Sequence, residues 1–111
     1  MGVEIRTAGD ALVLELAGSV DGQTVPAIQT SVTQALGGAA RIVLLMKQVS
    51  FLSSAGLRFL LLVYRQAKAK GGKVGLVGVS EEIRDVMETT GFLPYFVFAD
   101  TEEGGLAAVR S

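Results

Sequence analysis

The sequence has 111 residues, half of them hydrophobic, and a formal net charge of −1 from ten basic and eleven acidic side chains. This length supports one domain with a single core, and the lack of a basic run or of tryptophan argues against direct nucleic-acid binding. The absence of cysteine and histidine excludes disulfides, thiolate or imidazole metal ligands, and Ser-His or Cys-His nucleophile pairs.

The first residues show no signal-peptide pattern. The longest apolar run, residues 59–64, is bounded by arginines and is far too short to span a membrane. We therefore expect a soluble, cytoplasmic domain that does not insert into a membrane.

The N-terminal part of the chain predicts a hairpin. Residues 3–7 are a weak strand candidate and residues 11–16 a stronger one, and residues 8–10 between them have turn chemistry. Residues 17–23 are rich in glycine and small polar side chains, so we expect a loop there.

A first helix should follow this loop. Thr24 can cap it, Pro26 is tolerated in its first turn, and Gly37-Gly38 should end it. The apolar residues that recur at helical spacing are Val25, Ile28, Val32, Ala35 and Leu36.

The next strand and helix contain the stretch on which the functional prediction depends. Residues 41–46 are typical of a buried strand, and residues 54–70 form a helix that ends before a glycine pair. Ser53 and Ser54 stand between the two, where either can cap the helix. Free N–H groups and the positive end of the helix dipole gather at such a position, which favours a phosphate on one of these serines. A capping role alone is the simpler explanation.

At 100° per residue, this helix has two distinct faces. The residues expected on the core face are Gly56, Leu57, Leu60, Val63, Tyr64 and Ala67. Ser54, Arg58 and Arg65 fall on the opposite stripe, which Leu61 and Leu62 flank. A hydroxyl, two arginines and two leucines make this stripe a candidate partner surface, and an ordinary solvated face is the alternative.

A further strand and helix follow. Residues 73–79 predict a short apolar strand, Ser80 should cap the third helix, and Gly91 should end that helix. The apolar stripe of this helix comprises Ile83, Val86, Met87 and Thr90.

The C-terminal segment predicts a last strand and a last helix. The strand should cover residues 95–98, after the break at Pro94. Asp100 and Glu103 could form a capping pair for a helix to about residue 109, although two glycines inside it weaken the prediction.

The order β-β-α-β-α-β-α-β-α implies a largely parallel sheet with helices packed against it.

The sequence matches neither the dinucleotide-binding fingerprint nor the P-loop motif, and no G-x-S-x-G elbow surrounds Ser54. Asp21 lies in a loop that follows a strand, and such loops commonly carry function. Capping or turn formation is the simpler role for Asp21.

Three stretches together resemble the STAS family, which includes the bacterial anti-sigma factor antagonists. Residues 51–57, FLSSAGL, are similar to the family's phosphorylation loop, and residues 18–21, GSVD, to its glycine–acidic stretch. Residues 86–98, with an aromatic strand, are similar to its C-terminal pattern. The resemblance implies one α/β domain over residues 1–111, with a four- to five-stranded mixed sheet and about four helices packed largely on one side.

The chain departs from the family loop, which usually has Asp-Ser-Ser or Asp-Ser-Thr before Gly-Leu. Ser53 stands at the aspartate position, Ser54 at the phosphoacceptor position and Ala55 at the second hydroxyl position. The resemblance therefore makes Ser54 the expected phosphorylation site, with Ser53 as a cap or a rival acceptor. The missing carboxylate affects which kinase would recognise the loop.

The resemblance implies a non-catalytic switch protein without a cofactor or metal. When unphosphorylated, it would bind an anti-sigma factor that is also an ATP-dependent serine kinase. Phosphorylation of Ser54 would abolish this binding, and a serine phosphatase would restore it. The expected partner-binding residues are Asp21, Ser53, Ser54, Arg58, Leu61, Leu62 and Arg65.

Two other classes of function remain open. A regulatory STAS subunit of a membrane transport assembly would dock through the same surface without phosphorylation. An enzyme with Ser54 as nucleophile is disfavoured, because the chain has no histidine and its lysines lie at helix ends. A neighbouring gene for an ATPase-type kinase, or for a transport ATPase, would discriminate between the first two classes.

Overall fold

A mixed sheet of five strands forms the centre of the fold in a computed structural model that describes residues 2–37 and 39–110. The strands lie in sequence order across the sheet: β1 (Gly2–Ala8), β2 (Ala11–Val20), β3 (Arg41–Leu52), β4 (Lys73–Val77) and β5 (Val97–Ala99). The first pair is antiparallel and the other three pairs are parallel. The predicted α/β class and the mixed sheet are therefore confirmed.

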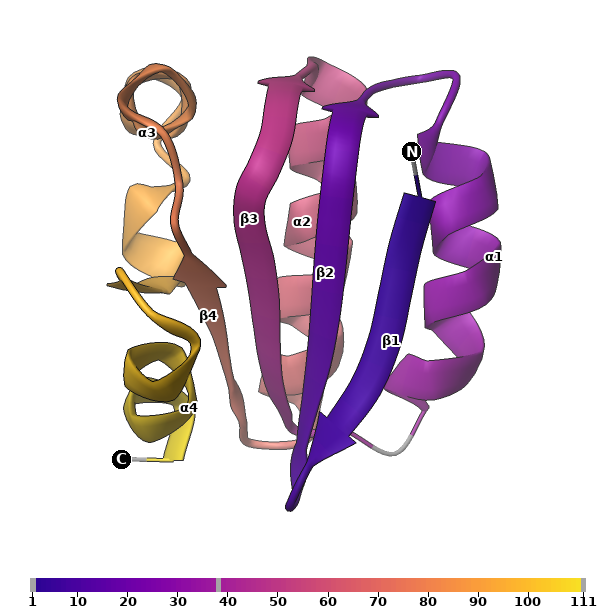
Figure 1. Cartoon of the computed structure of the whole chain (residues 1–111), viewed down its shortest axis with the longest axis vertical. Helices are drawn as coiled ribbons and strands as arrows, with labels where there is room; N and C mark the ends of the chain where they lie inside the picture. Colours follow the sequence, from indigo (N-terminus) through magenta and orange to yellow (C-terminus); the bar gives the residue numbers. More distant parts are fainter. Residues whose placement is uncertain (1, 38, 111) are drawn as a thin grey trace.

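Four helices connect and cover these strands (Figure 1). They are α1 (Val25–Leu36), α2 (Ser54–Ala69), α3 (Glu81–Thr89) and α4 (Glu102–Arg110), with a short 3₁₀ turn, η1 (Leu93–Tyr95), before β5. Among residues 2–37 and 39–110, no helix has the length and apolar character needed to cross a bilayer.

The two faces of the sheet have different helix coverings. Buried side chains of α1, α2 and α3, including Ile28, Leu60 and Met87, pack on one face in the main core. Val43 and Val77 point to the other face, where Val109 of α4 packs against them. Three helices thus share one face, as expected, and α4 covers part of the other.

Two strands are longer than the sequence indicated. Residues 17–20, expected in a loop, belong to β2, and β3 continues to Leu52 instead of ending at residue 46. The two extensions pair with each other, since Val20 is the partner of Leu52, and the register shifts at two points along the way. This pairing joins segments about thirty residues apart, so local composition contained no signal for it.

The structure places the end of α1 and both ends of α3 close to their predicted positions. Gly37 is the C-cap of α1, and its neighbour Gly38 lies outside the described residues. The Ser80 hydroxyl caps α3 by accepting a hydrogen bond from the Ile83 amide at 3.2 Å. Gly91, with φ of 82°, follows α3 as expected.

The C-terminal prediction needs two corrections. Part of the predicted strand over residues 95–98 forms the end of η1, and β5 is confined to Val97–Ala99. The cap of α4 comes from Thr101, whose hydroxyl accepts a hydrogen bond from the Gly104 amide at 3.0 Å, rather than from Asp100. A Cβ on Gly105 would lie 2.6 Å from a Val77 methyl, so a glycine there lets α4 approach the sheet closely.

Candidate functional site

Ser53 is the N-cap of α2 and its hydroxyl is already engaged. The backbone of this half-buried residue is extended, with φ −87° and ψ 178°. Its Oγ accepts a hydrogen bond from the Gly56 amide at 3.3 Å and donates one to the Val20 carbonyl at 3.4 Å. Its own amide donates to the same Val20 carbonyl at 3.0 Å, which ties the start of α2 to the end of β2.

Ser54, the first residue of α2, is exposed. Within the described part of the chain, its hydroxyl has no hydrogen-bond partner. The amides of Gly56 and Leu57 bond to the side chain and the carbonyl of Ser53, so the amides of Ser54 and Ala55 remain at the open end of the helix. A phosphate on Ser54 would meet these amides and the positive end of the helix dipole.

Asp21 organises the loop between β2 and α1. One carboxylate oxygen accepts hydrogen bonds from the amides of Gln23 at 2.9 Å and Thr24 at 3.1 Å. Thr24 occupies the N-cap position of α1 but does not cap it with its hydroxyl, contrary to the prediction. That hydroxyl instead accepts from the Asp21 amide at 3.0 Å and donates to the Ser19 carbonyl at 2.9 Å. Asp21 therefore shapes the loop by capping, which was the simpler of its two expected roles.

This loop and the start of α2 lie against each other. A Cβ on Gly22 would be 4.0 Å from the Cβ of Ala55, and one on Gly56 would be only 2.4 Å from the Val20 carbonyl oxygen. Only glycine at position 56 allows α2 to begin this close to β2. Asp21, Ser53 and Ser54 consequently gather at one corner of the molecule.

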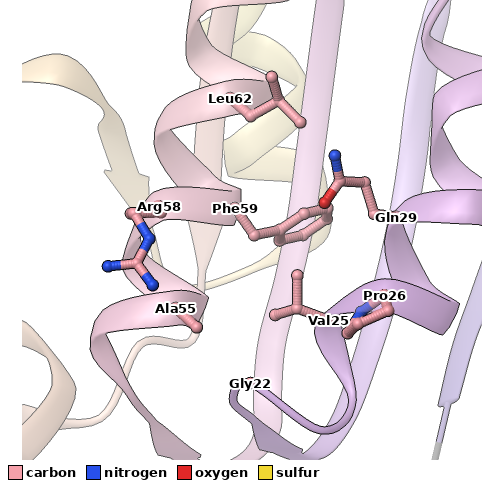
Figure 2. Close-up of a pocket in the computed structure, with 8 residues that line it drawn as sticks. All are labelled: Gly22, Val25, Pro26, Gln29, Ala55, Arg58, Phe59 and Leu62. Carbon is pink, nitrogen blue, oxygen red and sulfur yellow. The ribbon is translucent and has the colours of Figure 1, made fainter.

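An open groove of about 430 Å³ runs between α1 and α2 beside this corner (Figure 2). The residues that line this α1–α2 groove are Gly22, Val25, Pro26, Gln29, Ala55, Arg58, Phe59 and Leu62. Figure 2 shows the Phe59 ring between the two helices near Val25, and Arg58 extending outward from α2 above Ala55. The groove thus has an apolar floor and a cation at its rim.

The predicted partner stripe of α2 has exposed arginines, as expected, but its two leucines are partly covered. Arg58 and Arg65 are exposed, whereas Leu61 and Leu62 are half-buried. Leu62 lines the groove, but Leu61 is not among its lining residues. Arg58 lies one turn from Ser54, and Arg65 lies two turns further along the helix.

Two aromatic residues of this region were not among the predicted partner-binding residues. Phe51, the penultimate residue of β3, is 55% exposed, and it stands two positions before the cap. Phe59 is 2% exposed and forms the groove floor, because α1 packs against its side of α2. On the helical wheel Phe59 lies between the core face and Leu62. This position could have predicted that Phe59 contributes to the groove.

No three acidic side chains come close enough to hold a metal ion anywhere in residues 2–37 and 39–110. The residues of the site offer hydroxyl, amide, guanidinium and apolar groups, together with the single carboxylate of Asp21. This set suits a modifiable serine next to a protein-binding surface.

Comparison with known sequences identifies the family of the chain. The sequence matches the profile of the STAS domain family over residues 2–104. It is 36% identical over 74 residues to BtrV of Bordetella bronchiseptica, which is named as an anti-sigma factor antagonist. That match covers 67% of this chain and 64% of BtrV, so it spans just under two thirds of that relative.

Solved structures share the fold. The protein TM1081 of Thermotoga maritima, also named as an anti-sigma factor antagonist, superposes with a TM-score of 0.90 at 19% identity, over 98% of this chain and 95% of that one. The phosphorylated form of the Bacillus cell fate determinant SpoIIAA superposes with a TM-score of 0.76 at 24% identity, over 96% and 98% of the two chains.

Proposed function

The chain belongs to the STAS domain family, and we propose that it is an anti-sigma factor antagonist whose binding is switched off by phosphorylation of Ser54. The observation that supports this most directly is the contrast between two neighbouring hydroxyls. Ser54 is exposed and its hydroxyl has no partner in the described residues, whereas the Ser53 hydroxyl is occupied in capping α2. A kinase could reach Ser54 without disturbing the fold.

In the unphosphorylated state, the chain would bind an anti-sigma factor and so release the sigma factor. The binding surface would comprise the start of α2, the loop around Asp21 and the α1–α2 groove. Phe51 at the end of β3 and Leu62 at the groove offer exposed or half-exposed apolar area for a partner. Such area drives association when water is excluded from it.

Phosphorylation would add a charge of about −1.5 to −2 at the centre of this surface. The modified chain should stay folded, because the phosphate faces free amides at the start of α2. SpoIIAA, which has the same fold, is known in a phosphorylated form. Binding would be lost because the interface would have to desolvate the phosphate, and a serine phosphatase would restore it.

The test is to incubate the chain with ATP and each anti-sigma factor of its host, and to locate phosphate by mass spectrometry. One phosphate on Ser54 is expected. Ser54→Ala should bind the same anti-sigma factor and remain unmodified, and Ser54→Asp should bind more weakly. Ser53→Ala is the matched control and should still be phosphorylated.

Phosphate on Ser53 or Thr90, with Ser54 unmodified, would overturn the assignment. Binding without phosphate on any residue would instead favour docking to a transport assembly.

The contribution of the groove can be tested separately with Leu62→Lys. Leu62 is half-buried at the groove, so a lysine can extend into solvent with little loss of stability. Binding of the anti-sigma factor should weaken by about tenfold or more, because a charge would then occupy an apolar contact. An unchanged dissociation constant, measured by calorimetry, would remove the groove from the proposed surface.

A further inference from the structure

The charged side chains of the two helices that border the groove are all basic. Helix α1 has no charged residue, and α2 has three, which are Arg58, Arg65 and Lys68. All three are exposed, and none forms an ion pair with a residue in the described ranges. We call these three residues the basic stripe.

The basic stripe lies on one side of α2 and begins one turn after Ser54. At 1.5 Å per residue, Arg58 lies about 6 Å along the helix axis from Ser54, and Lys68 about 21 Å. All three side chains project within about 40° of the direction of Ser54 around the helix. A partner that covers Ser54 would therefore also cover these cations.

Acidic side chains are concentrated on another element. The charged residues of α3 are Glu81, Glu82, Asp85 and Glu88, with a single cation, Arg84. Figure 1 shows α3 and α1 at opposite edges of the sheet, with α3 beside β4 and α1 beside β1. Asp21, the acidic residue closest in the chain to α1, has one carboxylate oxygen bound to backbone amides. The helices α1 and α2 together therefore carry only positive side-chain charge, although the whole chain has a net charge of −1.

We propose that the basic stripe binds an acidic surface on the anti-sigma factor, and that phosphate on Ser54 releases this partner by cancelling most of the positive charge. This inference rests on the proposed function. Complementary charge favours association, and like charges placed opposite each other oppose it. A phosphate of about −1.5 to −2 offsets much of a stripe with three cations. Ser53, in place of a carboxylate, leaves the unmodified loop without an acidic residue that would weaken the attraction.

Salt distinguishes this charge mechanism from simple steric exclusion. Raising the salt from about 0.1 M to about 1 M shortens the Debye length from about 10 Å to about 3 Å. The unphosphorylated chain should then bind the anti-sigma factor that phosphorylates it about tenfold more weakly. The ratio of the dissociation constants of the phosphorylated and unphosphorylated chains should fall by a similar factor. A ratio that does not change with salt would overturn the charge mechanism.

Charge-reversal variants locate the effect. Arg58→Glu and Arg65→Glu should each weaken binding by about tenfold, whereas Arg58→Lys should retain it. The matched control is Lys70→Glu, which makes the same charge change at the other end of α2 and about 160° around the helix from Ser54. The control should change binding by less than about threefold, and circular dichroism would confirm that each variant is folded.

Two failures of this experiment have different meanings. If no anti-sigma factor of the host binds the unmodified chain, the proposed function is wrong and this inference fails with it. If one binds and phosphorylates Ser54, but Arg58→Glu and Arg65→Glu behave like Lys70→Glu, only the inference about charge is overturned.

Discussion

Ser53 and Ser54 are neighbours in the chain, yet their hydroxyls have different surroundings. The sequence predicts that both lie at the start of a helix, but it does not indicate which of the two is the cap. That assignment depends on where the extended backbone of β3 ends, and Ser53 is the last extended residue because its amide bonds to Val20 of the neighbouring strand. The cap is thus determined by a contact between distant segments, which local sequence does not contain.

A stability measurement should separate the two serines. Ser53→Ala removes the cap of α2 and should lower the free energy of unfolding by about 1 kcal/mol. Ser54→Ala removes a hydroxyl that has no partner in the described residues, so its effect should stay within about 0.5 kcal/mol. Urea denaturation of both variants measures the difference. Equal losses would show that Ser54 also contributes to the cap.

Asp21 offers a second comparison at the scale of one residue. Asp21→Ala removes the oxygen that accepts from the amides of Gln23 and Thr24, and should cost about 1 kcal/mol of unfolding free energy. Asp21→Asn keeps an oxygen in the same position and should retain most of that stability. If Asp21→Asn destabilises as much as Asp21→Ala, the charge of Asp21 rather than its capping geometry stabilises the loop.

At the scale of elements, periodicity predicted which side chains of one helix are buried, but it did not predict how the elements pack against each other. Five of the six residues expected on the core face of α2 are buried, and the sixth, Tyr64, is half-buried. Its ring packs against those of Tyr95, at 5.0 Å between centroids, and Phe96, at 5.9 Å. Long-range packing determines which side of the sheet α4 covers and how far β2 and β3 extend. No local sequence pattern indicated either feature.

Leu60 gives the direct test of the α2 packing. It is fully buried between α2 and the sheet, so Leu60→Ala should lower the free energy of unfolding by about 2–5 kcal/mol through lost burial and a cavity. The matched control, Leu61→Ala on the half-buried side of the same helix, should cost clearly less. A loss below about 0.5 kcal/mol for Leu60→Ala would contradict the helix orientation.

At the scale of the whole molecule, ion pairs connect the two ends of the chain. Arg6 of β1 donates two hydrogen bonds to the Glu102 carboxylate of α4, at 2.7 and 2.5 Å. Asp10, in the turn after β1, pairs with both Arg41 and Arg110. These pairs complement the apolar contact of Val109 with the sheet, and they hold α4 on the face opposite α2.

The Arg6–Glu102 pair should make stability depend on pH. The hydrogen bonds from Arg6 lower the pKa of the Glu102 carboxyl group, and the same pair raises the pKa of Arg6. A lowered pKa in the folded state stabilises the fold above the pKa of the unfolded chain, about 4.3, and this stabilisation is lost as the pH falls through the folded value. The stability advantage of the wild type over Glu102→Gln should therefore be present at neutral pH and disappear in acid.

Denaturation of both proteins between about pH 7 and about pH 3 measures this dependence, and the Glu102 carboxyl resonance in NMR reports its pKa directly. The matched control is Glu103→Gln, because Glu103 is adjacent and exposed and forms no ion pair with a described residue. Replacing Arg6 with glutamine should return the pKa of Glu102 toward its ordinary value, because the donors that favour the carboxylate are then lost. A Glu102 pKa that does not rise in Arg6→Gln would contradict the pairing, and α4 would then depend on its apolar contacts alone.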